Sequence, residues 1–530
     1  MKKISVNTHN IKITVILFTI LTIFSALIVW LIFLDKARPC GAEARKLLNC
    51  LEYINLNFTN VPIISEIIYT PLRTQSPLCF IISTFFCFLS GGFSYRICVL
   101  PNILYYFIIA VSVYLLALRF TKSYSLGLLS ILLVSSSHYY FLNYSRLFNM
   151  EFAICAMVSA SIYLLLRTEN FSKEKFNLIF IISFVIGLLF KITYLYYMSP
   201  VLCVFVLINT VNLVKNYDDL VVVKNYKNMV IMLVLGCVFA LLIMSFFVDF
   251  KNLLWAYRNH LSEEYSVKGL SDYYALFTKH FLWEVNSIKF VRFDNFISYA
   301  FIGILAYCII ALCKKSKQIA VLLLSWYLLP LFLIPLIVGE KEVRLMLPLL
   351  PAQALIITTG VSFLKKWKRL VMIVILTLLS IYILSSNLIF IYKTTDRVNH
   401  LENAIIKIQK ESLTEPVLKI RNVAVIAENN NLVDSVFYFM VNKSNINFID
   451  LGYYGKPGCD KIDPNSAMLK QLASLDYLIT DYAAIHSCPF IKNNLNTVKL
   501  IELDKFSYDD NFMKSPRSEW KNVVVYRLSR

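Results

Sequence analysis

Long apolar runs separated by short basic segments make up most of the first 395 residues. A helix needs about 20 consecutive apolar residues to cross the hydrocarbon core of a bilayer. The first run, Ile13 to Leu34, has about 22, which exceeds the roughly 7 to 15 of a signal-peptide core, so we expect it to persist as a span. The sequence predicts about eleven spans, the other ten lying near 99–118, 124–144, 152–166, 177–195, 197–213, 229–248, 296–313, 319–338, 345–362 and 370–391.

Basic clusters at the ends of these runs set the predicted orientation, because Lys and Arg concentrate in cytoplasmic loops. The segment from Pro77 to Ser90 is about 14 residues long, which is typical of re-entrant or interfacial helices. Leaving it out of the spans brings the N-terminus and all the basic clusters to the cytoplasmic side. These clusters are Arg119 and Lys122; Arg167, Lys173 and Lys175; Lys215, Lys224 and Lys227; Lys314, Lys315 and Lys317; and Lys365, Lys366, Lys368 and Arg369. The outer face then holds residues 35–98 with their interfacial helices, the 250–295 loop and the C-terminus.

The composition changes after residue 395, where Asn, Asp and Lys become frequent. Short runs there predict strands at 423–427, 447–451, 476–480, 497–503 and 523–528, and they alternate with helix-like stretches at 432–440 and 467–475. We therefore expect two domains. Residues 1–395 form a polytopic α-helical membrane domain, and residues 396–530 form a small extracytoplasmic α/β domain.

Composition excludes a soluble protein, since 58% of the 530 residues are hydrophobic and only 16% are charged, against roughly 25% charged in soluble domains. The net charge of +19 is explained by the basic clusters, so no nucleic-acid partner is expected. Most of the 12 cysteines lie in apolar runs, where a thiol packs as a small hydrophobe. Cys40 and Cys50 share one predicted outer segment, and Cys459 and Cys488 another. Disulfides are permitted there, but spacing does not decide the pairing.

Two acidic residues of the predicted outer face are candidates for chemistry. Glu43 follows the first span and is suited to accept a proton from a hydroxyl that arrives from outside. The alternative is a solvated residue at the start of a helix. The turn from Arg146 to Glu151 carries a cation and an anion between two spans, and its alternative is a simple marker of the span ends.

Several cations are expected at the same membrane edge. Lys191 lies about three residues from the outer end of its apolar run, and an ionisable residue in a span indicates function. The alternative is that it reaches to the interface without a specific role. Arg258, His260 and Arg344 follow in predicted outer segments, and the four together would form a positive pocket suited to a lipid phosphate. The sequence has no nucleotide-binding motif and no His/Cys cluster typical of zinc or haem.

Six short motifs in a fixed order give the chain a resemblance to a known family. They are Ala42-Glu43, Val61-Pro62, Ser76-Pro77-Leu78, Arg146 to Glu151, Gly187 to Lys191 and Arg344 to Pro351. With these motifs the chain resembles the multispan glycosyltransferases of the C-type fold that use polyprenyl-phosphate sugars, especially the lipid A aminoarabinose transferases and the protein O-mannosyltransferases. The resemblance covers about residues 10–395.

The resemblance implies transfer of a sugar from a polyprenyl-phosphate donor to a hydroxyl of a lipid, glycan or protein, outside a membrane and with inversion. The family's usual catalytic Asp aligns with Ala42, so Glu43 would be the base, with Glu66 as its nearest rival. Donor phosphate and sugar would be bound by Arg146, Glu151, Lys191, Arg258, His260 and Arg344. No cofactor is required, and a divalent cation is left open. A bacterial inner membrane is the expected location, with its lipids as further partners.

Two other classes of protein fit part of the pattern. A transporter or flippase would also have many spans, but transporters place ionisable groups near the midplane within internal repeats, whereas the charges here lie at the outer ends and no repeat is present. A catalytically inactive scaffold is favoured by the missing Asp at position 42. Further departures are Ser76 in place of the first proline of Pro-Pro-Leu, and Leu345 in place of the tyrosine of Arg-Tyr.

Overall fold

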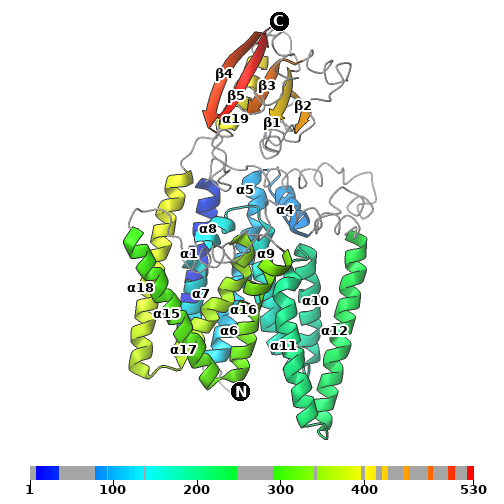
Figure 1. Ribbon diagram of the computed structural model, residues 1–530, viewed down its shortest axis with the longest axis vertical. Helices are drawn as coiled ribbons and strands as arrows, with labels where there is room; N and C mark the ends of the chain where they lie inside the picture. The colour runs from blue at the N-terminus through cyan, green and yellow to red at the C-terminus, as the bar shows by residue number, and fades with distance from the viewer. Residues whose placement is uncertain are drawn as a thin grey trace. The chain divides into compact units, whose positions relative to one another are not determined.

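The computed structural model of the protein consists of two compact units, one helical and one built on a sheet (Figure 1). The helical unit contains α1 and α4 to α18, and the second unit contains α19 and five strands. The residues that the structure describes are 8–34, 50, 78–91, 94–136, 139–247, 291–338, 343–395, 400–413, 421–427, 446–453, 475–481, 499–507 and 522–529.

The helical unit is a bundle of long apolar helices joined by short turns. In chain order its elements are α1 (Thr8–Leu34), α4 (Leu78–Leu89), α5 (Tyr95–Val99), α6 (Pro101–Thr121), α7 (Tyr124–Ser136), α8 (Tyr139–Ser145), α9 (Met150–Arg167), α10 (Glu174–Phe190), α11 (Tyr194–Lys215), α12 (Leu220–Phe247), α15 (Val291–Lys315), α16 (Lys317–Val338), the 3-10 helix η2 (Val343–Leu349), α17 (Leu350–Ser362) and α18 (Lys366–Thr395). The predicted apolar runs fall mainly on helices, so the polytopic α-helical fold is confirmed. Within the described residues, eight helical stretches are long and apolar enough to cross a membrane.

Two predicted spans compare with the structure as follows. The span predicted at 124–144 falls on α7, described to Ser136, and on α8, which begins at Tyr139, and the two residues between them lie outside the described residues. The run predicted at 177–195 ends early: α10 stops at Phe190, and Lys191 follows it in extended backbone. Lys191 therefore lies at the end of a helix and not inside a span.

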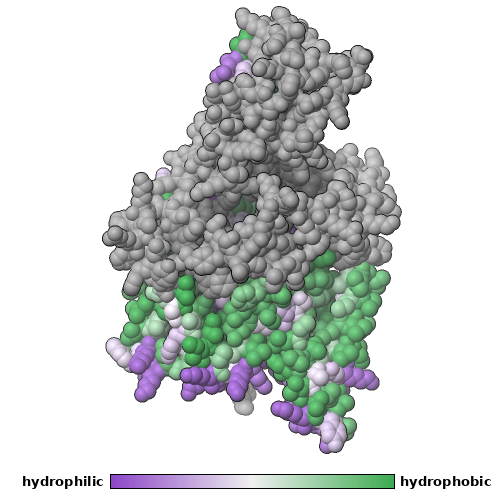
Figure 2. Space-filling view, in the orientation of Figure 1, coloured by the Kyte–Doolittle hydropathy of each residue, from purple (hydrophilic) through white to green (hydrophobic). Residues whose placement is uncertain are grey.

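Hydrophilic side chains gather along one edge of the helical unit, below a wide hydrophobic band (Figure 2). The turns between α11 and α12 and between α17 and α18 lie at this edge (Figure 1). Lys215 ends α11, and Lys366 begins α18. The distribution is the one expected of a membrane protein whose basic clusters share one side, and which side that is stays a prediction.

The interior of the bundle is built around α9 and α17. Helix α9 packs against α6, α10 and η2, whereas α17 packs against α6, α7 and α15. Gly360 of α17 lies so close to Cys308 of α15 that a Cβ atom would clash with it, which lets these two helices approach closely. Peripheral helices instead expose apolar side chains such as Phe18, Leu241 and Leu378, as expected for a lipid-facing surface.

The second unit is a mixed sheet with strand order β2-β1-β3-β5-β4. Its elements are α19 (His400–Leu413), β1 (Arg421–Ala427), β2 (Ile446–Tyr453), β3 (Tyr477–Asp481), β4 (Lys499–Ser507) and β5 (Asn522–Ser529). β1 pairs in parallel with β2 and β3, whereas β5 pairs antiparallel with β3 and β4. All five predicted strands are present, and the α/β class is confirmed. The helix-like stretches predicted at 432–440 and 467–475 lie outside the described residues.

Candidate active site

The turn between α8 and α9 carries Arg146 and is anchored by side chains from two preceding helices. The hydroxyl of Tyr95 in α5 donates to the backbone oxygen of Arg146 at 2.9 Å. The amide nitrogen of Asn102 in α6 donates to the backbone oxygens of Ser145 and Leu147 at 2.9 and 2.8 Å. These groups are all buried, so the bonds fix the path of the turn and the direction in which α9 begins.

Helix α9 begins with a cap that places a buried carboxylate in its first turn. The side chain of Asn149 accepts a hydrogen bond from the backbone N–H of Glu151 at 3.3 Å. The side chain of Glu151 is only 1% exposed. A carboxylate at this position is stabilised by the positive end of the α9 dipole.

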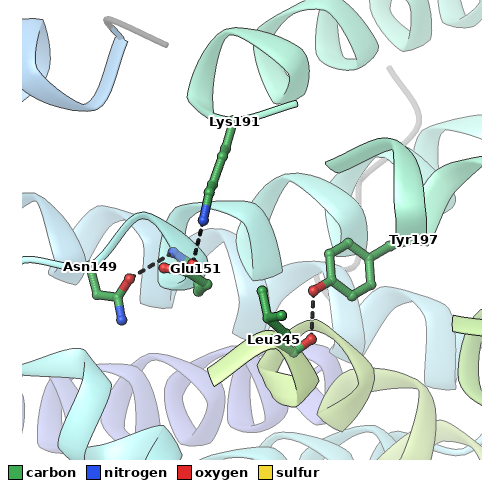
Figure 3. A network of polar contacts seen from close by, with 5 residues as sticks. All are labelled: Asn149, Glu151, Lys191, Tyr197 and Leu345. Atoms are coloured by element: carbon green, nitrogen blue, oxygen red, sulfur yellow. Dashed lines mark hydrogen bonds and ion pairs between the residues drawn. The ribbon is translucent and has the colours of Figure 1, made fainter. Parts of the chain in front are cut away.

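Lys191 forms an ion pair with this carboxylate. Its Nζ donates to Oε1 of Glu151 at 2.6 Å, and the lysine side chain keeps 30% exposure (Figure 3). Lys191 follows the last residue of α10, where a cation complements the negative helix end. An ammonium group has three donors and Glu151 engages one of them, so a partly exposed Lys191 keeps the capacity to bind a further anion.

A close contact behind Lys191 fixes the end of α10 against α11. The hydroxyl of Tyr194 donates to Oγ of Ser161 in α9 at 2.7 Å, and Ser161 and Ser183 are joined at 2.8 Å. The ring of Tyr194 fills the space beside Gly187, where a Cβ atom would lie only 2.5 Å from the ring carbons. Gly187 is therefore required by the packing that positions Lys191.

Replacing Gly187 by alanine is expected to lower the free energy of unfolding by about 1–3 kcal/mol, because overpacking would push a ring that Ser161 holds in place. Thermal unfolding of the purified variant in detergent measures the change. Gly303→Ala in α15 is the matched control, since nothing lies within 4 Å of its Cβ position. An unchanged midpoint for Gly187→Ala would contradict the expectation.

The 3-10 helix η2 is held at the same end of α9 by side chains from three helices. The hydroxyl of Tyr197 in α11 donates to the backbone oxygen of Leu345 at 2.5 Å. The thiol of Cys155 in α9 donates to that of Leu347 at 3.6 Å. The indole N–H of Trp326 in α16 donates to that of Pro348 at 3.2 Å. Figure 3 shows the Tyr197 contact in the same region as the ion pair, and both η2 and α11 pack against α9. The backbone at Arg344 is thereby brought to the site. Its side chain is outside the described residues.

Three of the sequence motifs thus converge at one place: the turn from Arg146 to Glu151, the Gly187 to Lys191 segment and the start of η2. Arg146 is only 3% exposed, so its side chain is buried and does not lie on the surface. The remaining predicted site residues, Glu43, Glu66, Arg258 and His260, lie outside the described residues. Within the parts that are described, no group of three or more His, Cys, Asp or Glu residues could hold a metal ion.

Sequence reasoning missed the groups that support the site. Tyr95, Asn102 and Tyr197 each donate a hydrogen bond to backbone of the site from a distant point of the chain. Asn102 could have been identified from the sequence, because a side-chain amide at the start of a long apolar run needs a hydrogen-bond partner in a membrane. The sequence did not distinguish Tyr95 and Tyr197 from the other tyrosines, since the chain has 32 in all.

Comparisons with known proteins find one family model and several solved structures that are similar to the chain. Residues 74–245 match the family described as dolichyl-phosphate-mannose-protein mannosyltransferase, and this stretch includes Arg146, Glu151 and Lys191. No curated protein sequence matches the chain.

Solved structures similar to the chain cover nearly its whole length. ArnT from Cupriavidus metallidurans in the apo state matches with a TM-score of 0.61 and 12% identity, over 96% of this chain and 97% of that one. The chain has the C-type glycosyltransferase fold. ArnT bound to undecaprenyl phosphate matches with a TM-score of 0.56 and 10% identity, over 96% of this chain and 98% of that one. The apo oligosaccharyltransferase of Archaeoglobus fulgidus matches with a TM-score of 0.51 and 11% identity, over 93% of this chain and 73% of that one.

The C-type fold confirms the resemblance predicted from the six motifs. Sequence identities near one in ten establish the fold alone.

Proposed function

We propose that this protein is a membrane glycosyltransferase that moves a sugar from a polyprenyl-phosphate carrier to an acceptor hydroxyl on the extracytoplasmic face, with inversion at the anomeric carbon. The observation that carries the proposal is the ion pair of Lys191 with the buried Glu151, which holds a partly exposed ammonium at the ends of apolar helices. A lipid-linked phosphate has its charged group at this depth of the membrane. The C-type fold and the motifs at 146–151, 187–191 and 344–351 support the same reading.

The chemistry requires a base on one side of the anomeric carbon and cations on the other. The acceptor oxygen attacks that carbon while a carboxylate, Glu43 or its rival Glu66, takes the hydroxyl proton. The bond from the carbon to the phosphate oxygen breaks, and the phosphate leaves with the electron pair. Lys191 and Arg344 would stabilise its negative charge, with Arg258 and His260 of the long loop beside them. A single displacement of this kind inverts the configuration.

Glu151 and Arg146 have supporting parts in this proposal. Glu151 is buried and aims the ammonium of Lys191, so it acts as a positioning residue. The buried Arg146 lies in the turn that sets the start of α9. A carrier of the polyprenyl-phosphate class is supported by the similar fold of ArnT, which was crystallised with undecaprenyl phosphate. The acceptor class, whether lipid, glycan or protein, is left to experiment.

The proposed site requires a defined orientation, with the basic edge of the bundle in the cytoplasm and the C-terminus outside, as in a bacterial inner membrane. Reporter fusions after residue 395 measure this directly: alkaline phosphatase should be active there and a cytoplasmic reporter silent. The opposite pattern would place Lys191 and Glu151 on the cytoplasmic side. It would end the proposal of an extracytoplasmic reaction.

Donor turnover separates a transferase from the other classes. The purified protein in nanodiscs is incubated with a panel of undecaprenyl-phosphate sugars, and released undecaprenyl phosphate is measured by mass spectrometry. A transferase releases it from at least one donor in the presence of acceptor membranes. Movement of intact donor across proteoliposomes without release would indicate a flippase, and neither release nor donor binding would indicate a scaffold.

A further inference from the structure

Two buried cysteines meet at the junction of α4 and α5. The Sγ atoms of Cys87, in the last turn of α4, and Cys98, in α5, are 3.3 Å apart. Both side chains are at most 2% exposed. An S–S bond is about 2.05 Å long, so the two sulfurs would need to approach by only ~1.3 Å, which a small side-chain rotation supplies.

A hydrogen bond that does not involve the sulfurs joins the two helices at this contact. Oγ of Ser83 in α4 donates to the backbone oxygen of Cys98 in α5 at 2.9 Å. At the end of α4, Oγ of Ser90 donates to the backbone oxygen of Cys87 at 2.9 Å, and Gly91 follows with a φ of +71°, a conformation that favours glycine. The Ser83 contact therefore helps to bring Cys98 beside α4.

The location of this junction in the helical unit decides the redox environment of the thiols. Helices α4 and α5 lie at the end of the unit opposite the hydrophilic edge (Figures 1 and 2). In the proposed orientation that end is extracytoplasmic, where disulfides form and persist. The inference that follows rests on this part of the proposed function.

We propose that Cys87 and Cys98 form a disulfide in the mature protein. The oxidant is the disulfide of a thiol–disulfide oxidoreductase: its two sulfurs are reduced to a dithiol as the two thiols of this chain lose two protons and two electrons to form the S–S bond. The hydrogen bond with Cys98, and then burial, raise the pKa of the Cys87 thiol.

The disulfide would cross-link two elements that contact the turn before Glu151. Phe80 of α4 packs on Phe148 of the turn, with ring centroids 6.0 Å apart. Tyr95 of α5 donates to the backbone oxygen of Arg146 in the same turn. Linking α4 to α5 therefore stabilises one wall of the candidate active site.

Peptide mapping of the full-length protein tests the disulfide. Cells are lysed directly in denaturant that contains N-ethylmaleimide, so that buried thiols are also blocked, and the purified protein is digested with trypsin without reductant. Trypsin cleaves after Arg73 and Arg96, so Cys87 and Cys98 fall in different peptides that stay joined only by a disulfide. Mass spectrometry should detect the joined pair, and dithiothreitol should remove it.

Cys79 provides the matched control, because it lies in the same tryptic peptide as Cys87. The joined pair should persist in Cys79→Ser and disappear in Cys87→Ser. Dithiothreitol should also lower the thermal midpoint of the parental protein by more than it lowers that of the Cys87→Ser/Cys98→Ser double variant. Maleimide on both Cys87 and Cys98 of the untreated protein would overturn the proposal.

The reporter fusions after residue 395 distinguish a failure of the disulfide proposal from a failure of the proposed function. If both thiols carry maleimide and the reporter is extracytoplasmic, the disulfide proposal alone is refuted. If both thiols carry maleimide and the reporter is cytoplasmic, the proposed orientation is refuted as well.

Discussion

Replacing Glu43 by glutamine should lower sugar transfer by roughly 10²- to 10⁴-fold while donor binding survives, because the variant keeps the shape of the side chain and loses the base. Glu43 follows Ala42, which the resemblance would align with the family's usual Asp and which cannot accept a proton. A glutamate reaches one methylene further than an aspartate, which compensates in part for the shift by one position. Turnover of the donor found in the nanodisc panel, with its affinity measured in parallel, gives both quantities.

Glu66→Gln is the comparison that assigns the base. If Glu43→Gln transfers sugar at the parental rate and Glu66→Gln abolishes transfer, Glu66 is the base. If neither substitution matters, the enzymatic function itself should be given up in favour of a scaffold. Ala42→Asp tests the same alignment in the opposite direction, since it restores the family's usual acid and should support transfer in the Glu43→Gln background.

Replacing Lys191 by glutamine should weaken donor binding by about 10- to 150-fold, the equivalent of a charge-assisted hydrogen bond of about 1.5–3 kcal/mol. Arg344→Gln is expected to have a similar effect. Affinity for undecaprenyl phosphate in nanodiscs, measured by native mass spectrometry, checks both. Unchanged affinity in both variants would remove these residues from the site.

A loss of stability must be separated from a loss of binding in the Lys191 variant. Removing the ammonium breaks an ion pair of a buried carboxylate, which costs about 3–5 kcal/mol in well-buried pairs. The Glu151→Gln/Lys191→Gln double variant removes both charges, so it should recover the thermal midpoint without recovering affinity. Lys173→Gln is the matched control, because its pair with Glu169 is 3.8 Å long and more than half exposed, and such pairs contribute little.

The spans and strands were predictable because their signals are local. Apolar runs of membrane-spanning length marked the helices, and short runs of apolar, often β-branched residues marked β1 to β5. The strand order β2-β1-β3-β5-β4 was beyond prediction, since it depends on pairing between segments far apart in the chain.

The individual charged residues of the site were predictable from the sequence, but the contacts between them were not. Glu151 and Lys191 were each identified as charges at a membrane edge, but their ion pair joins residues 40 positions apart and depends on how α9 and α10 pack. The contact of Tyr197 with the backbone of Leu345 spans 148 positions. Such contacts follow from tertiary packing, and the sequence pattern of one helix does not contain them.

The central claim is that Lys191 binds the phosphate of a polyprenyl carrier. The most direct measurement is a cryomicroscopy structure of the protein in nanodiscs with undecaprenyl phosphate. The account predicts phosphate density within hydrogen-bond distance of Nζ of Lys191, about 3 Å, while Oε1 of Glu151 keeps its contact with the same ammonium. Phosphate density at another place on the bundle, with no phosphate near Lys191 and its ion pair with Glu151 unchanged, would contradict the claim.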